Sequence, residues 1–271
     1  MLPIVSHPSV VSFGLSALGK VFSRPQLRHF ANYITGLMVC QNRTVEGINN
    51  SFPAHLDQSA LNHFLTDSTW SDDELDKARY GFVNARLKEL NFEGGVLIVD
   101  DTIAHKTGKS MEGVGIHFDT SEGRYTLGHQ LVTTHYARGW VSVPLDFEVY
   151  IKRDKMEEGF KTKLELAREL IQKAVDRNVP FSSVVFDAWY FNHDMTSFIE
   201  ALGKDWVASC KGNRHILVGR RKVRLSEWAA GLQRELLRPM KFKRADGSTK
   251  VYYVYEKVVT LAKHRQKSRC S

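Results

Sequence analysis

Cysteine is scarce in this sequence, and its scarcity excludes two structural classes. The 271 residues include three cysteines, Cys40, Cys210 and Cys270, which are odd in number and far apart. They fit neither a disulfide framework nor a zinc ribbon. Long apolar runs are also missing: Val10–Leu18 is mildly apolar, but it is too short to cross a bilayer, and no lysine or arginine precedes it. We therefore expect a cytoplasmic protein without membrane association.

Acidic residues are scarce only in the last quarter of the chain. From residue 211 to the end, 17 lysines and arginines stand against 4 acidic residues, a local balance of +13. Because the whole chain carries +8, the first 210 residues carry −5. A strongly basic C-terminal region on a more acidic body is typical of nucleic-acid-binding proteins. A solvated basic surface or a disordered tail is the alternative. We expect DNA as the partner and a nucleoid-associated protein.

The first ninety residues have mostly helical patterns. Residues 1 to about 24 show no clear period and are expected to form an arm. Helices are expected at 26–40, at 57–65, and from a capping box at Ser71 and Glu74 to about Leu90. We interpret residues 1–93 as a helical DNA-binding region.

The pattern then changes to strands. Strands are expected at 95–99, 125–134, 141–150, before Asp187, and at 206–210; helices are expected at 157–177 and up to about 202. This element order is that of an RNase H-like fold, whose mixed sheet brings the first and fourth strands side by side. The sequence therefore predicts an α/β, RNase H-like catalytic core over 94–210. A basic, partly β insertion region over 211–271, which we expect to be incomplete, would follow.

Two of the predicted strands end in an aspartate. Gly95–Val99 leads into Asp100 and Asp101, and Val184–Phe186 leads into Asp187. Such apolar runs are typical of buried strands, whose ends hold a side chain rigidly at the rim of the sheet. Either aspartate alone would also suit a turn or a helix cap.

Together, the two aspartates suggest a metal site. Mg²⁺ and Mn²⁺ prefer oxygen ligands, and two such ions can activate an attacking water or hydroxyl and stabilise the departing oxygen. We predict Asp101 and Asp187 as catalytic metal ligands. Alternation along the strand puts Asp100 on the side opposite Asp101, beside the site or in a turn.

Four spaced blocks carry a family resemblance. They are Val99-Asp100-Asp101-Thr102 before a Lys/Gly-rich turn, Gly128-His129-Gln130-Leu131-Val132, Pro144-Leu145-Asp146-Phe147, and Phe186-Asp187-Ala188-Trp189-Tyr190. In this order they resemble DDE transposases of bacterial insertion sequences, of the insertion-sequence 4 and 701 types. The resemblance implies a helical region that helps to bind the element's ends, an RNase H-like core that cuts and joins strands, and a β-rich insertion. It also implies double-stranded DNA with terminal inverted repeats as substrate and a homodimer on that DNA.

The resemblance also implies a catalytic triad with two Mg²⁺ or Mn²⁺ ions. Its first acid would be Asp101, and its second, which opens the helix after the fourth strand, would be Asp187. The third is a glutamate in the helical signature Y-x2-R-x3-E-x6-K. Glu256 has the downstream lysine, but Tyr252 and Thr249 replace the arginine and the tyrosine, and its surroundings have a strand pattern. We reject Glu256 and expect a truncated transposase that binds DNA but transposes weakly or not at all.

Four further residues are weaker candidates for DNA contacts: Lys106, Lys109, Arg153 and Trp228. The basic side chains would contact phosphates, and the tryptophan would stack on an unpaired base; solvated charges and a core tryptophan are the plain alternatives. Other functions stay open as well. The chain could be a DNA-binding remnant that modulates intact transposase, or another RNase H-like nuclease. A glycosidase with two carboxylates is disfavoured by the basic tail.

Overall fold

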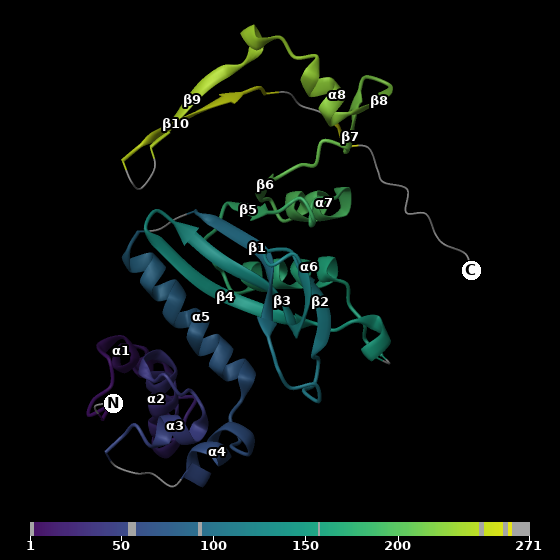
Figure 1. Cartoon of the computed structure of the whole chain (residues 1–271). Coiled ribbons are helices and arrows are strands. Elements are labelled where there is room, and N and C mark those ends of the chain that lie inside the picture. Colours follow the sequence, from purple (N-terminus) through teal and green to yellow (C-terminus); the bar gives the residue numbers. More distant parts are fainter. Residues whose placement is uncertain are drawn as a thin grey trace. The chain divides into compact units, whose positions relative to one another are not determined.

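The computed structural model describes residues 3–53, 58–91, 94–156, 158–243, 247–256 and 260–261 (Figure 1). The chain divides into two compact units, Met1–Glu93 with Ala174–Pro180, and Gly94–Lys173 with Phe181–Ser271. Within the described ranges, no helix combines the length and apolar character that crossing a membrane requires.

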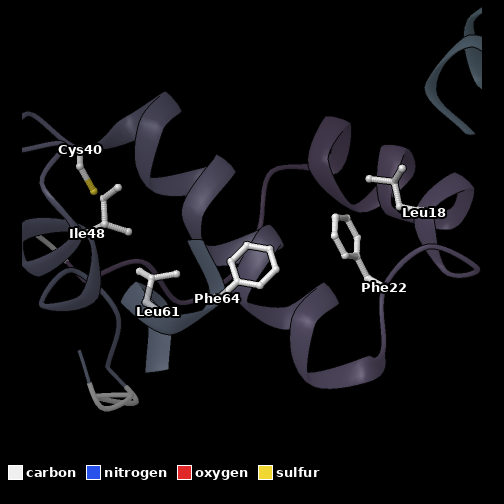
Figure 2. Close-up of a cluster of buried hydrophobic side chains, with 6 residues drawn as sticks. All are labelled: Leu18, Phe22, Cys40, Ile48, Leu61 and Phe64. Carbon is white, nitrogen blue, oxygen red and sulfur yellow. The ribbon is translucent and has the colours of Figure 1, made fainter. Parts of the chain in front are cut away.

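The first unit is helical. Its helices are α1 (Ser9–Leu18), α2 (Arg24–Val39), α3 (Val45–Asn49), α4 (Gln58–Thr66) and α5 (Asp72–Glu89). Figure 2 shows part of their shared core, which consists of Leu18, Phe22, Cys40, Ile48, Leu61 and Phe64. The prediction that residues 1 to about 24 form an arm was wrong for Ser9–Leu18, which form α1. This short helix is apolar around most of its surface and therefore shows no clear period. Asp57, the expected start of the second helix, lies outside the described residues.

Helix α2 approaches α3 closely at Gly36. A Cβ atom at Gly36 would lie 2.4 and 2.6 Å from two side-chain carbons of Ile48, which is fully buried. Alanine is better than glycine inside a helix by about 1 kcal/mol, but overpacking a core costs about 1–3 kcal/mol. We therefore expect Gly36→Ala to lower the free energy of unfolding by about 1 kcal/mol in urea denaturation.

Gly14 of α1 is the matched control for that substitution. Nothing lies within 4 Å of a Cβ built there, so Gly14→Ala is expected to keep the helical gain without the clash. If Gly36→Ala were as stable as Gly14→Ala, the Ile48 contact would not limit the approach of the two helices.

The second unit is built on a six-stranded mixed sheet. Its strands are β1 (Val96–His105), β2 (Gly115–Asp119), β3 (Arg124–Arg138), β4 (Val141–Tyr150), β5 (Ser183–Phe186) and β6 (Asp205–Ala208). β3 is antiparallel to β1, β2 and β4, whereas β5 is parallel to β1 and β6. The first and fourth predicted strands, β1 and β5, are thus neighbours. The predicted RNase H-like fold class is confirmed, with the short strand β2 added before β3.

Helix α6 (Lys163–Asp176) runs along one face of this sheet (Figure 1). It begins later than the predicted position 157, which lies outside the described residues. Thr162 and Glu165 form a capping box: the Thr162 N–H donates to Glu165 Oε2 at 2.7 Å, and the Glu165 N–H donates to Thr162 Oγ1 at 3.2 Å. The capping box makes Lys163 the first residue of the helix.

The rest of the second unit consists of small elements. They are η1 (Arg153–Lys155), α7 (His193–Ala201), β7 (His215–Val218), β8 (Arg221–Arg224), α8 (Leu225–Ala230), η2 (Arg234–Leu236), β9 (Arg238–Lys243), β10 (Thr249–Val254) and β11 (Thr260–Leu261). β9 pairs with β10, and β7 pairs with β8 and β11, in two small separate sheets. The predicted β content after the core is therefore present.

Candidate active site

The predicted acids lie where the parallel pairing of β1 and β5 ends. Val99 of β1 pairs with Phe186, the last residue of β5. The prediction that the first strand ends at Val99 was wrong, because β1 continues through Asp100 and Asp101 to His105 in its pairing with β3. Asp187 directly follows Phe186. The structure therefore brings together, on adjacent strands, the two predicted ligands that lie far apart in the sequence.

Three donors hold the Asp101 carboxylate. Gln130 Nε2 of β3 donates to Oδ2 at 2.6 Å, and the Lys163 ammonium of α6 donates to the same oxygen at 3.0 Å. The Tyr190 hydroxyl donates to Oδ1 at 3.3 Å. Because the three donors come from different parts of the fold, the orientation of this carboxylate is fixed before any ligand arrives.

The donors themselves are constrained. Tyr190 is fully buried, and this burial raises the pKa of its hydroxyl, with the negative charge of Asp101 adding to the effect. Tyr190 therefore stays protonated and remains a donor. The Lys163 ammonium also lies 4.0 Å from the centroid of the Trp189 ring.

Asp100 and Asp187 flank this carboxylate in different ways. Asp187 Oδ1 accepts hydrogen bonds from the backbone N–H groups of Trp189 at 2.8 Å and Tyr190 at 3.3 Å. It therefore closes a turn, and α7 begins only at His193, so Asp187 does not open the helix directly as the resemblance implied. Burial raises the pKa of Asp100, and the negative charges of Asp101 and Asp187 raise it further. The three carboxylates thus lie within electrostatic reach of one another.

This donor set fits a divalent cation. Hard cations such as Mg²⁺ bind carboxylate oxygens, and Asp101 is already paired with a positive charge, the Lys163 ammonium. The excess of negative charge that raises the pKa of Asp100 is the kind of field that a metal ion would neutralise. Asp101 and Asp187 are the residues that would hold such an ion.

A second group of possible ligands lies between the last residue of β1 and the β2–β3 hairpin. His105, Asp119 and Glu122 bring one ligand atom each within 4.8 Å of one another; it is the one such group of three in the described part of the chain. Its atoms already have partners, since His105 Nε2 lies 3.1 Å from Asp119 Oδ2, and Glu122 accepts from Arg124 Nε at 2.6 Å. Asp119 also accepts from the Ser121 N–H, so the group is explained by the closure of the hairpin.

The contacts described for the four weaker candidates do not involve Asp101. Lys106 is half-buried and its N–H donates to Leu127 O, while Lys109 is exposed in the following turn. The Arg153 guanidinium is exposed and lies 4.7 Å from the Phe160 ring centroid. Trp228 of α8 is half-buried, and its ring centroid lies 5.6 Å from that of Tyr255.

Sequence reasoning missed the three donors to Asp101. Gln130 and Tyr190 lie inside the blocks that carry the family resemblance, so their place in those blocks is a signal that could have identified them. Lys163 belongs to no motif. Its role depends on where α6 begins and on which face of the sheet that helix covers.

Comparisons with known proteins agree with this arrangement. Residues 17–258 match the family described as DDE superfamily endonuclease. The chain is 27% identical over 176 residues to the probable transposase for insertion sequence element IS701 from Microchaete diplosiphon. The alignment covers 63% of this chain and 46% of that relative, so the chain spans less than half the relative's length.

Among solved structures, the chain is similar to piggyBac transposase in a cryo-EM structure of its synaptic complex with hairpin DNA. The TM-score is 0.40 with 8% sequence identity, over 85% of this chain and 51% of that chain. At this level of similarity the fold assignment depends on the strand order and register of the chain itself.

Proposed function

The chain belongs to the DDE superfamily endonucleases, and we propose that it is a DNA transposase that acts at the ends of an insertion sequence. The reaction would be metal-dependent cleavage followed by strand transfer. The observation that carries the proposal is the Asp101 carboxylate, which three donors hold within β1, next to the end of β5 that Asp187 follows. Family membership implies a divalent metal ion as cofactor.

We propose Mg²⁺ or Mn²⁺ as that cofactor, with two ions in the complete site. When bound, such ions activate the attacking water or hydroxyl and stabilise the departing oxygen. Asp101 would be a ligand to both ions and Asp187 to one. Gln130 and Tyr190 keep the Asp101 carboxylate in place, and the raised pKa of Tyr190 ensures that its hydroxyl donates rather than adds charge.

The proposed substrate is double-stranded DNA with terminal inverted repeats, bound by a homodimer. Residues 1–93 would help to bind the ends, 94–210 would carry the chemistry, and the basic region 211–271 would contact phosphates. Lys106, Lys109, Arg153 and Trp228 are proposed as further DNA contacts.

The third acid of the proposed triad is not assigned to a described residue. Glu256 follows strand β10, and its carboxylate lies 3.4 Å from Arg238 Nη2. We propose that this chain binds DNA but transposes weakly or not at all. Strong strand transfer that Glu256→Gln abolishes would contradict this and make Glu256 the third ligand.

Gel-shift titration tests the proposed substrate. Duplexes with the inverted repeats that flank the coding sequence are expected to bind at least about tenfold more tightly than scrambled duplexes, since specific sites commonly gain far more than this over non-specific DNA. Equal affinity, with Mn²⁺-dependent nicking of any duplex, would favour another RNase H-like nuclease. Specific binding without any nicking would favour a DNA-binding remnant, and the absence of DNA binding would overturn the proposal.

A further inference from the structure

Lys163 is held at the candidate site from both sides. Its ammonium lies 3.0 Å from Asp101 Oδ2 and 4.0 Å from the Trp189 ring centroid. Its backbone is fixed because the capping box of Thr162 and Glu165 starts α6 at this residue. The side chain is 13% exposed and that of Asp101 is 21% exposed, so water screens their attraction only partly.

The ammonium takes up a position that a metal ion would compete for. Oδ2 of Asp101 already accepts from Gln130 as well as from Lys163, which leaves little room on that oxygen for a further positive group. A divalent cation bound to Asp101 would also repel the ammonium, because two positive charges that share one carboxylate repel each other strongly in a partly buried site. The two cations are therefore expected to exclude one another at Asp101.

Lys163 has a second partner that does not depend on Asp101. Trp189 is 44% exposed as a residue, and its ring attracts the ammonium through its π face. If the ion pair with Asp101 broke, the lysine would keep this contact and stay beside the site. The backbone N–H of Trp189 donates to Asp187 Oδ1 at 2.8 Å, so the backbone that carries this ring is tied to the second predicted ligand.

We propose that Lys163 is a positioning residue that acts as a substitute cation. Without metal, it neutralises the Asp101 carboxylate and keeps three neighbouring acids stable; when a divalent ion binds, the ion displaces it from Asp101 and it remains over Trp189. This inference rests on the proposed function, because it takes Asp101 as a metal ligand. Its consequence is that the lysine weakens metal binding while it stabilises the metal-free fold.

Isothermal titration of the full chain with Mn²⁺ tests the competition. Lys163→Met is expected to bind Mn²⁺ about tenfold more tightly than the parent, which corresponds to about 1.4 kcal/mol. Lys163→Arg keeps the charge and is expected to bind nearly as the parent does. Lys161→Met is the matched control. Lys161 precedes α6, and its exposed ammonium pairs with Glu169 of that helix at 2.8 Å, so this substitution should leave the affinity unchanged.

Asp101→Asn separates the failure of this inference from the failure of the proposed function. If Asp101→Asn loses Mn²⁺ binding but Lys163→Met binds as the parent does or more weakly, Lys163 is not a competing cation and only this inference is overturned. If Asp101→Asn binds Mn²⁺ as tightly as the parent, the metal site itself is elsewhere and both fail.

Tryptophan emission gives a second readout that does not need an affinity change. Mg²⁺ should alter the emission of the parent, because the ammonium that Asp101 and the Trp189 ring now share would be held by the ring alone, and Trp189→Phe should remove that change. Lys163→Met should remove it too, and an unaltered change in this variant would overturn the inference. Thermal unfolding without metal checks folding: Lys163→Met is expected to melt below Lys163→Arg, because its three carboxylates have lost their cation.

Discussion

Replacing Asp101 with asparagine is expected to weaken Mn²⁺ binding by at least about 100-fold. The substitution keeps the shape of the side chain but removes its charge, and partners of metal ligands alone are commonly worth about 10–100-fold in affinity. Asp187→Asn is expected to act in the same direction. Isothermal titration of the full chain measures both effects.

The hairpin cluster provides the matched control for this experiment. Asp119 lies with His105 and Glu122 in the group that brings its ligand atoms within 4.8 Å, so Asp119→Asn tests the competing location. We expect Asp119→Asn to bind Mn²⁺ as the parent does. If it lost binding while Asp101→Asn retained it, the cation would bind at His105, Asp119 and Glu122, and Asp187 would serve only to close its turn.

The pairing of the two strand-end acids could be predicted because it depends on a short-range pattern and a topology rule. Asp101 and Asp187 each follow an apolar run, and the element order brings β1 and β5 together as parallel neighbours. The parallel pairing ends at Val99 and Phe186, so the residues that follow on the two chains are neighbours whatever their distance in the sequence. Their adjacency follows from the fold class alone.

The groups that hold Asp101 could not be predicted in the same way. Lys163 reaches Asp101 from a helix that crosses the face of the sheet, and Tyr190 does so from the turn that Asp187 closes. Helical periodicity places the start of the predicted helix before Lys163, whereas the capping box of Thr162 and Glu165 starts the helix at Lys163. Where two local signals disagree, the hydrogen bonds of the helix end decide the boundary, and with it the position of the lysine.

Raising KCl from 50 to 200 mM is expected to lower DNA affinity by about 10³-fold or more. The region from residue 211 onward carries 17 basic residues against 4 acidic ones, enough for at least about six phosphate contacts. Each contact releases counterions, so log Kd against log salt should have a slope of magnitude about 5 or more. Fluorescence anisotropy with a labelled duplex measures the slope over this range.

Two lysines of strand β9 are expected to contribute to this salt dependence. Lys241 and Lys243 are both exposed and, two residues apart, lie on the same side of the strand. The double substitution of both residues by alanine is expected to reduce the magnitude of the slope by about 2, because each lost phosphate contact removes about 0.9. Lys161→Ala, whose lysine pairs with Glu169, should leave the slope unchanged. If both variants kept the slope of the parent, the phosphate contacts would be made by other residues. Lys241 and Lys243 would then be solvated surface charges that do not bind DNA.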